Sequence, residues 1–362
     1  MDTLLAVGTM KGLFRFLSRD DGATWTLAGV DFKEEPVYTA LFDDRTSTLI
    51  ASPQSFFYGP QVARSKDLGE TWDTSATPPA YSESDAEKVT RLWALAKGPE
   101  DEPNVLYAGV EASGLFRSED AGGTWQEIES LRTHPTHDTW AAGFGGKCLH
   151  TIVIDPHSAG RIMIACSTGG AYRSDDGGKT WAPKNKGVRV DFAPEGQNFP
   201  ESGQCVHKVA GSPSLPGRMW MQNHGGVYRS DDAGDTWQDV GQTLPSDFGF
   251  GLVTHPTRPD TAFVIPLAAD EYARWGPGAR LTVWHTDDAG ETWAERSTGL
   301  PDPAYVGVLR DGFRGWGADP LHLALGTTSG GLYTSADEGR TWSEVAQHLP
   351  RILFVGAWSI AR

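Results

Sequence analysis

Two short segments of the chain place a cysteine and a histidine in the same pattern. They are GKCLH, which ends at His150, and GQCVH, which ends at His207, and a third histidine, His224, follows in QNHGG. Neutral imidazoles are common ligands of divalent metals, and histidine can also serve as a general base. His150, His207 and His224 are therefore a candidate metal site, and His150 and His207 are also candidate catalytic residues.

The alternative for these histidines is structural. Two segments with one pattern can descend from a duplicated repeat, in which both histidines are hydrogen-bonded packing residues. Cys148 and Cys205 lie two residues before the histidines, so on a strand they share a face with them. The C-x-H spacing is not that of a zinc finger, and we favour the interpretation that these are buried free cysteines.

Carboxylates and aromatic rings provide a second kind of candidate chemistry. A glycosidase needs two carboxylates beside the sugar bond, separated by ~5–10 Å, and aromatic rings can stack on sugars. The remaining catalytic candidates are Asp247 and Glu271, and the ligand-binding candidates are Arg91, Glu111, Asp138, Trp140 and Tyr272. Each carboxylate could instead be a surface or turn residue, and each ring could anchor loop packing.

The elements that must position these residues contain a motif that recurs seven times, [ST]-x-D-x-G-x-T-W. The copies are spaced 47 to 56 residues apart and begin at Ser18, Ser65, Ser118, Ser174, Ser230, Thr286 and Ser335. A repeat of about this period with turn and aromatic residues predicts a β-propeller with one blade per copy.

The residue types of the motif suit a tight hairpin. The Asp can accept backbone N–H groups, the Gly can adopt positive φ, and the Trp can be buried between neighbouring sheets. A catalytic or metal site normally occurs once, so we interpret the seven copies as structural. They contain 16 of the 47 acidic residues and four basic ones, which accounts for most of the net charge of −16.

The segments around each copy read as strands. Three short segments rich in β-branched and aromatic residues precede a copy and one follows it, which predicts four antiparallel strands per blade. The first blade lacks a first strand, whereas residues 352–362 form a strand-like segment with no blade of its own. We expect this C-terminal strand to join the N-terminal blade and close the ring. The predicted fold is therefore all-β, a seven-bladed propeller forming one domain over residues 1–362.

Strand counting also predicts where a site lies. If the motifs form hairpins at one end of the blades, then both the connections between blades and the turns between the second and third strands of a blade lie at the other end. The long connections are residues 73–88, 126–147, 182–204 and 266–280. Long loops on a rigid scaffold are often functional, so we expect the site at this end, with His150 and His207 near the mouth of the central channel.

The seven motifs resemble the Asp-box (BNR) repeat of sialidases, two-propeller xyloglucanases, sortilin-type receptors and a photosystem II assembly factor. The resemblance covers essentially the whole chain and implies a propeller of the glycosyl-hydrolase-like type. In sialidases the boxes lie opposite the active site. The R-I-P stretch of sialidases is absent and Arg91 is the only arginine at the expected start of a blade, so classical sialidase activity is not expected. Xyloglucanases use a cleft between two propellers, and this chain has residues for one.

These features predict a glycosyl-hydrolase-like protein that acts on or binds a small molecule or glycan opposite the boxes, with a histidine-bound divalent metal as candidate cofactor. The alternative is a non-catalytic protein-binding or assembly scaffold. The acidic charge argues against nucleic acid as a partner, and no apolar run of about 18 residues predicts a membrane span. Three cysteines and the absence of a signal-peptide pattern predict a cytoplasmic location.

Overall fold

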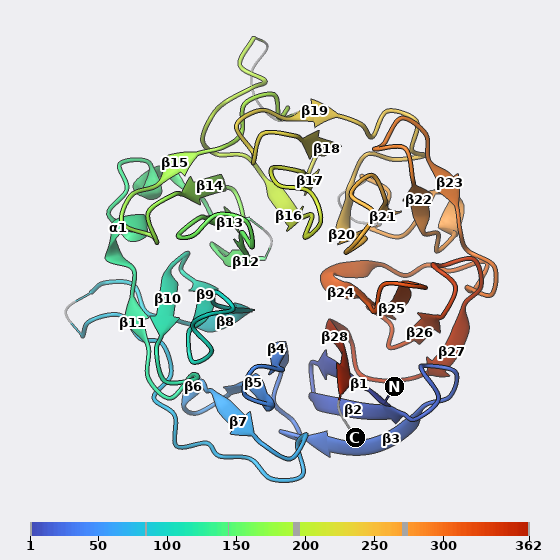
Figure 1. The fold of residues 1–362 in the computed structure, drawn as a ribbon, viewed down its shortest axis with the longest axis horizontal. Helices are drawn as coiled ribbons and strands as arrows, with labels where there is room; N and C mark the ends of the chain where they lie inside the picture. The colour runs from blue at the N-terminus through green and yellow to red at the C-terminus, as the bar shows by residue number, and fades with distance from the viewer. Residues whose placement is uncertain (1, 84, 144, 191–195, 270–273, 361–362) are drawn as a thin grey trace.

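A computed structural model describes residues 2–83, 85–143, 145–190, 196–269 and 274–360. In these ranges the secondary structure is almost entirely strand, with one short helix, α1 (Glu129–Arg132), and 3-10 turns at His137–Thr139 and Pro277–Ala279. Figure 1 shows small sheets that follow one another around a ring. The prediction of an all-β chain built from four-stranded antiparallel sheets, as in a β-propeller, is confirmed.

Most sheets contain strands that are consecutive in the chain and pair in that order. Four sheets of this kind have four strands each, running from the innermost to the outermost. They are β8 (Arg91–Lys97), β9 (Leu106–Glu111), β10 (Leu115–Ser118) and β11 (Gln126–Glu127); β12 (Leu149–Ile154), β13 (Ile162–Cys166), β14 (Gly170–Ser174) and β15 (Ala182–Pro183); β16 (Val206–Gly211), β17 (Met219–Asn223), β18 (Gly226–Ser230) and β19 (Gln238–Asp239); and β20 (Gly249–Thr254), β21 (Ala262–Pro266), β22 (Trp284–Thr286) and β23 (Ala294–Glu295). In a further sheet, β5 pairs with three strands, and its members are β4 (Val37–Asp43), β5 (Thr48–Ser55), β6 (Gly59–Pro60) and β7 (Ala63–Ser65).

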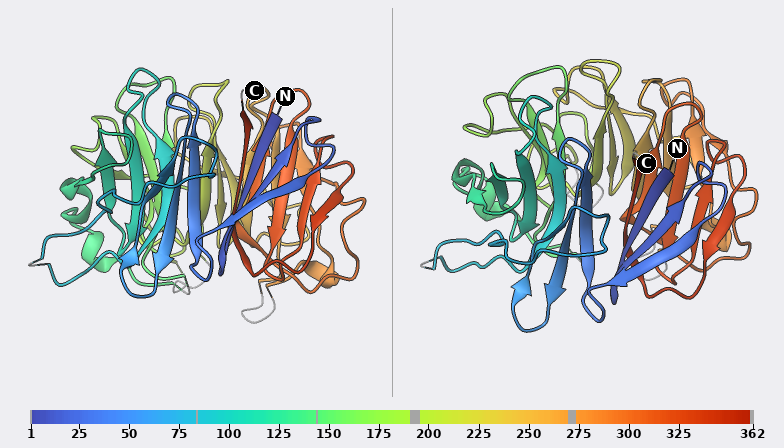
Figure 2. Two further views of the ribbon diagram at one scale, coloured as in Figure 1. Left: turned by 90° about the horizontal axis from the view of Figure 1, so that it is seen from below. Right: turned by 60° about the horizontal axis from the view of Figure 1, so that its bottom comes forward.

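The two ends of the chain share one sheet. Its strands, in spatial order, are β27 (Ser343–Ala346), β26 (Leu332–Ser335), β25 (His322–Thr327), β24 (Val308–Trp316), β28 (Ile352–Ile360), β1 (Asp2–Thr9), β2 (Gly12–Ser18) and β3 (Thr26–Asp31). The last strand, β28, is antiparallel to the first, β1, with Ile360 opposite Asp2 and Phe354 opposite Gly8. Figure 2 shows these two strands side by side. A single parallel pair, Asp311 with Phe354, connects β24 to β28.

Each Asp-box motif forms the same hydrogen-bonded turn. In the copy at Ser174, the serine hydroxyl donates to Asp176 Oδ1 (2.8 Å) and accepts the Gly178 N–H (2.8 Å). The Asp176 carboxylate also accepts the Thr180 N–H (2.9 Å) and hydroxyl (2.7 Å). All seven copies make these four bonds, and the fifth-position glycine has a φ between +80° and +96° in each. The motif therefore has the predicted structural role.

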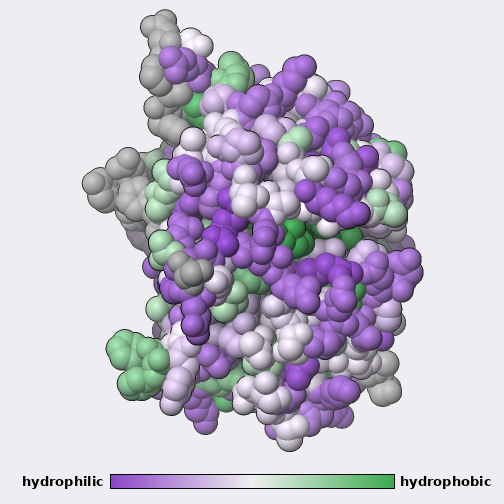
Figure 3. Space-filling view, turned by 90° about the vertical axis from the view of Figure 1, so that its left-hand side faces the viewer, coloured by the Kyte–Doolittle hydropathy of each residue, from purple (hydrophilic) through white to green (hydrophobic). Residues whose placement is uncertain are grey.

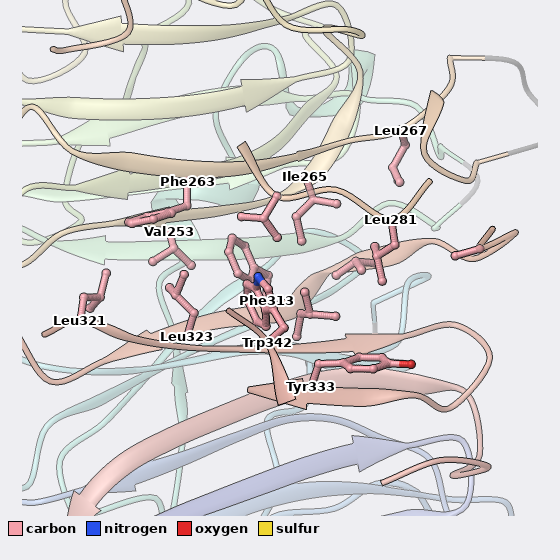
Figure 4. Close-up of a cluster of buried hydrophobic side chains, with 14 of the residues drawn as sticks. Val253, Phe263, Ile265, Leu267, Leu281, Phe313, Leu321, Leu323, Tyr333 and Trp342 are labelled. Carbon is pink, nitrogen blue, oxygen red and sulfur yellow. The ribbon is translucent and has the colours of Figure 1, made fainter. Parts of the chain in front are cut away.

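The box tryptophans connect neighbouring sheets. The indole N–H groups of Trp237, Trp293 and Trp342 donate to the carbonyls of Lys184, Val240 and Arg296, respectively. Each acceptor is the residue directly after the outermost strand of the preceding sheet. Figure 4 shows Trp342 in a buried cluster with side chains of the β20–β23 and β24–β27 sheets. In these three copies, a large ring packs between sheets while its N–H is hydrogen bonded, which suits Trp to the last position of the motif.

The box aspartates also make stability dependent on pH. Hydrogen bonds, first from the Thr180 hydroxyl, lower the pKa of Asp176 to about 2. Asp20, Asp67 and Asp288 have pKa values lowered to about 2 in the same way, and the pKa values of the other three box aspartates are also lowered. Because the folded pKa lies below the unfolded value of about 3.9, this stabilisation is complete above pH ~4 and is lost as the pH falls towards 2.

We predict that the thermal midpoint falls steeply between pH 4 and pH 2, with all seven boxes contributing. Asp176→Asn should lower the midpoint at pH 7, because the amide cannot accept the same charge-assisted bonds. At pH 2 the wild-type carboxyl is partly protonated, so the gap between the two proteins should narrow. Thermal melts of both proteins, followed by circular dichroism from pH 2 to pH 7, measure the difference in midpoint. A difference that does not change with pH would contradict the prediction.

Figure 3 shows one side that is largely hydrophilic, with an apolar group projecting at its edge. Among the described residues, the most exposed large apolar side chains are three consecutive aromatics, Phe56, Phe57 and Tyr58, which are 92%, 84% and 83% exposed. No helix in the described ranges has the length and hydropathy needed to span a bilayer.

Candidate functional site

A shift of register recurs near the start of the innermost strands. It falls between residues 37 and 40 in β4, 92 and 94 in β8, 149 and 151 in β12, 206 and 208 in β16, 249 and 252 in β20, and 308 and 313 in β24. Such bulges redirect side chains and are common beside functional sites. The residues within these shifts include Tyr38, Trp93, His150, His207, Phe250 and Arg310. All of them except His150 line one pocket.

This pocket has a volume of about 920 Å³, within the range typical of small-molecule sites. It opens at the end of the sheets away from the Asp boxes. In β8 and β9 the pair Arg91–Glu111 lies at the pocket, whereas Leu106, at the other end of β9, pairs with Ser118, the first residue of a box. Its described charged lining residues are the arginines 91, 274, 310 and 351 and the carboxylates of Glu111 and Asp311.

Two predicted ligand-binding residues meet in this pocket. The Glu111 carboxylate accepts hydrogen bonds from Arg91 Nη1 and Trp93 Nε1, both at 3.1 Å. The Arg91 guanidinium also lies over the Tyr38 ring, 4.3 Å from its centroid, and 5.3 Å from that of Trp93. A carboxylate, a guanidinium and two aromatic faces thus form one wall, an arrangement that can hydrogen bond and stack on a ligand.

The opposite wall comes from β24 and was missed by sequence reasoning. Arg310 Nε donates to the His207 carbonyl, and the guanidinium lies 5.9 Å from the Trp93 ring. Asp311 forms an ion pair with Lys208. Asp311 and Trp93 line both this pocket and a narrower cavity of about 320 Å³ between the inner strands, so the two cavities meet at these residues. Tyr305, which precedes β24, is 68% exposed, stacks on Trp275 and does not line the pocket.

A cluster of metal-ligating side chains lies on the same pocket. The potential ligand atoms of Cys205, His207 and His224 are all within 4.8 Å of one another. His207 Nδ1 is 2.6 Å from the Gly249 carbonyl oxygen, and Nε2 is 3.6 Å from Cys205 Sγ. Burial, and then the nearby charge of Arg310, hold the pKa of His207 well below its usual value, while burial raises the pKa of the Cys205 thiol. Both groups are therefore neutral near pH 7.

His150 does not join this cluster. Its Nε2 is 3.0 Å from the Val206 carbonyl oxygen and its Nδ1 is 2.9 Å from the Thr151 hydroxyl. Both ring nitrogens are therefore hydrogen bonded within the protein. It lines the narrower cavity, and burial followed by the charge of Arg310 lowers its pKa well below the usual value. The three histidines expected to form one cluster do not do so; the observed cluster consists of His207, His224 and Cys205.

Several other predicted site residues lie away from the pocket. Trp140 is buried, donates to the Tyr172 hydroxyl (3.1 Å) and packs against that ring, so it anchors a loop. Asp138 is exposed on a 3-10 turn, and Asp247 pairs with Arg189 at 3.3 Å. None of these three lines the pocket. Glu271 and Tyr272 lie outside the described residues.

Comparison with known proteins agrees with the turn geometry. The BNR/Asp-box repeat model matches residues 172–183. The chain carries Asp-box repeats. A probable oligoxyloglucan-reducing end-specific xyloglucanase of Neosartorya fischeri is 26% identical over 270 residues, which cover 66% of this chain and 30% of that protein. This chain therefore corresponds to less than a third of the relative's length.

Two solved structures show the same kind of fold. An ancestral GH74 enzyme aligns with a TM-score of 0.57 and 17% identity, covering 86% of this chain and 38% of that chain. YCF48 from Cyanidioschyzon merolae aligns with a TM-score of 0.52 and 13% identity, covering 86% of this chain and 85% of that one. At these identities the likeness concerns the fold alone, which is that of propeller-like proteins.

Proposed function

We propose that this chain is a seven-bladed propeller, closed by the pairing of β28 with β1, that binds a glycan in the pocket away from the Asp boxes. The observation that carries the proposal is the pocket itself, about 920 Å³, where Tyr38 and Trp93 present aromatic rings beside the carboxylate of Glu111. The xyloglucanase relatives support a sugar as the ligand class.

The charge of the pocket favours an acidic sugar. Its described lining residues include four arginines against two carboxylates, in a chain whose net charge is −16. A concave site with an excess of one sign of charge attracts ligands of the opposite sign, and guanidinium groups bind carboxylates through paired hydrogen bonds. We therefore propose that the glycan carries a carboxylate, as in a uronic acid.

Hydrolysis would require two carboxylates beside the sugar bond. Among the described residues of the pocket, Glu111 and Asp311 are the pair available, and we propose them as the catalytic carboxylates. Binding without hydrolysis is the second candidate function. It is favoured by the ion pairs Arg91–Glu111 and Lys208–Asp311, which engage both groups within the protein.

Calorimetric titration with an oligogalacturonate and with a neutral xyloglucan oligosaccharide tests the proposed ligand. We expect the acidic sugar to bind more tightly, and Trp93→Ala to weaken its binding at least ~10-fold through loss of the stacking surface. Tyr305→Ala, an exposed aromatic outside the pocket lining, should leave the affinity unchanged. Equal losses in both variants, or binding of neither sugar, would contradict the proposal.

Product analysis separates the two candidate functions. Hydrolysis of the bound sugar that disappears in Glu111→Gln and in Asp311→Asn, while both variants still bind, would identify an enzyme. Tight binding by the wild-type protein with no product formed would identify a binding module.

A further inference from the structure

We propose that Cys205, His207 and His224 bind a zinc ion and leave a coordination position open to the pocket. All three residues line the pocket of about 920 Å³. Three protein ligands with one open position is the arrangement of catalytic rather than structural zinc sites. This inference goes beyond the proposed glycan function and does not depend on it, because the ion can bind whether or not a sugar does.

The spacing of the first two ligands is already that of a metal-bound pair. With Zn–S near ~2.3 Å and Zn–N near ~2.05 Å, a tetrahedral angle separates sulfur and nitrogen by about 3.6 Å. Cys205 Sγ and His207 Nε2 are 3.6 Å apart. The His224 ring lies beside that of His207, with centroids 5.6 Å apart, and its ligand atom is within 4.8 Å of the other two. If the partly buried His224 side chain moves about 1 Å closer, all three ligand atoms reach the spacing of a tetrahedral zinc site.

The hydrogen bond of His207 fixes which ring nitrogen can bind a metal. A carbonyl oxygen only accepts, so the 2.6 Å contact with Gly249 requires Nδ1 to carry the proton. In the neutral ring, Nε2 then has a lone pair, and this atom faces Cys205. Metal-binding histidines characteristically donate their second N–H to a backbone carbonyl or carboxylate, which fixes ring orientation. The Gly249 carbonyl has that role here.

The repeated segment GKCLH lacks these features and provides an internal comparison. In His150 it is Nε2, not Nδ1, that contacts a backbone carbonyl, that of Val206, while Nδ1 contacts the Thr151 hydroxyl. Cys148 is fully buried and contacts the Ser167 hydroxyl at 3.2 Å. Position 151 holds Thr where the second segment has Lys208, so only the second segment keeps an imidazole nitrogen for a ligand.

Because the cluster lies among positive charges, we expect the Cys205 thiol to contribute more to zinc affinity than a neutral ligand does. Arg274 and Arg310 line the same pocket and disfavour a cation there. The Cys205 thiolate, formed when zinc displaces its proton, supplies the negative charge that offsets them. Loss of Cys205 should therefore weaken zinc binding more than loss of the neutral ligand His224.

Zinc titration of untagged protein, with a chromogenic chelator as competitor, measures affinity and stoichiometry. We expect one zinc per chain, affinity reduced at least ~10-fold in His224→Asn and at least ~100-fold in Cys205→Ser, and no change in the matched control Cys148→Ser. Cobalt should give a thiolate charge-transfer band in the near ultraviolet that Cys205→Ser removes and Cys148→Ser retains. Circular dichroism confirms that each variant is folded.

Two results would overturn the inference. One is the absence of stoichiometric zinc or cobalt binding by the folded wild-type protein. The other is equal metal binding by wild type, Cys205→Ser and His224→Asn, which would assign the metal to another part of the surface. Sugar titrations repeated with and without zinc keep the two proposals separate, because either one can fail while the other holds.

Discussion

Truncation of the chain after Arg351 is expected to abolish cooperative folding. The deletion removes β28, whose residues from Ile352 to Ile360 pair with β1 along its whole length. Apolar side chains of β28 are buried in three separate clusters, so their partners in neighbouring sheets would become exposed. The truncated protein would also present β1 as a long apolar edge, which promotes aggregation. Circular dichroism and size-exclusion chromatography would show unfolded or aggregated protein.

A circular permutant provides the control for this truncation. Because Ile360 lies opposite Asp2, a short loop can join the end of β28 to the start of β1 and place β28 first in the chain. The permutant has the same strands in the same places and should fold with a thermal midpoint near that of the original chain. A truncated protein that melts as cooperatively as the permutant would show that the pairing of β28 with β1 is not required for folding.

Arg45→Ala is expected to cost about 3–5 kcal/mol of folding free energy, because it leaves a buried carboxylate without its partner. The Arg45 guanidinium binds Asp43 in bidentate fashion, with two N···O distances of 2.8 Å, and neither side chain is more than 6% exposed. It also donates to the carbonyls of Gly98, Pro99 and Val105, which lie in the β8–β9 connection of the next sheet. Chemical denaturation of wild type and variant measures the difference.

Two further variants separate the charge from the geometry. Arg45→Lys keeps the charge but not the planar guanidinium that binds Asp43 and the backbone carbonyls together, so it should recover only part of the loss. The double variant Asp43→Asn/Arg45→Ala removes the uncompensated carboxylate and should be more stable than Arg45→Ala alone. If the double variant is no more stable than Arg45→Ala, the buried charge is not the cause.

The repeat architecture could be predicted because its determinants are local. The four hydrogen bonds of each box join residues two to four positions apart, so seven recurrences of one eight-residue motif predict seven identical turns. The strand pattern follows from alternation and β-branched content over a few residues. Even the pairing of β28 with β1 follows from strand counting alone.

The site could be predicted only in part, because bulges decide which side chains face the pocket. The sequence pointed to Arg91, Glu111, His207 and His224, which do lie there. It treated His150 and His207 as equivalents, but one neighbouring residue, Thr151, engages the ring of His150. The wide register shift in β24 brings Arg310 and Asp311 to the pocket, and no local sequence pattern predicts a shift of that size.

A crystal structure of the protein with a bound oligogalacturonate tests the proposed pocket most directly. The proposed function predicts sugar density in the pocket beside Trp93, with a sugar carboxylate bound by an arginine of the pocket and the ring near Glu111. Density on the face that carries the Asp boxes, or an empty pocket in crystals grown at saturating sugar, would contradict it.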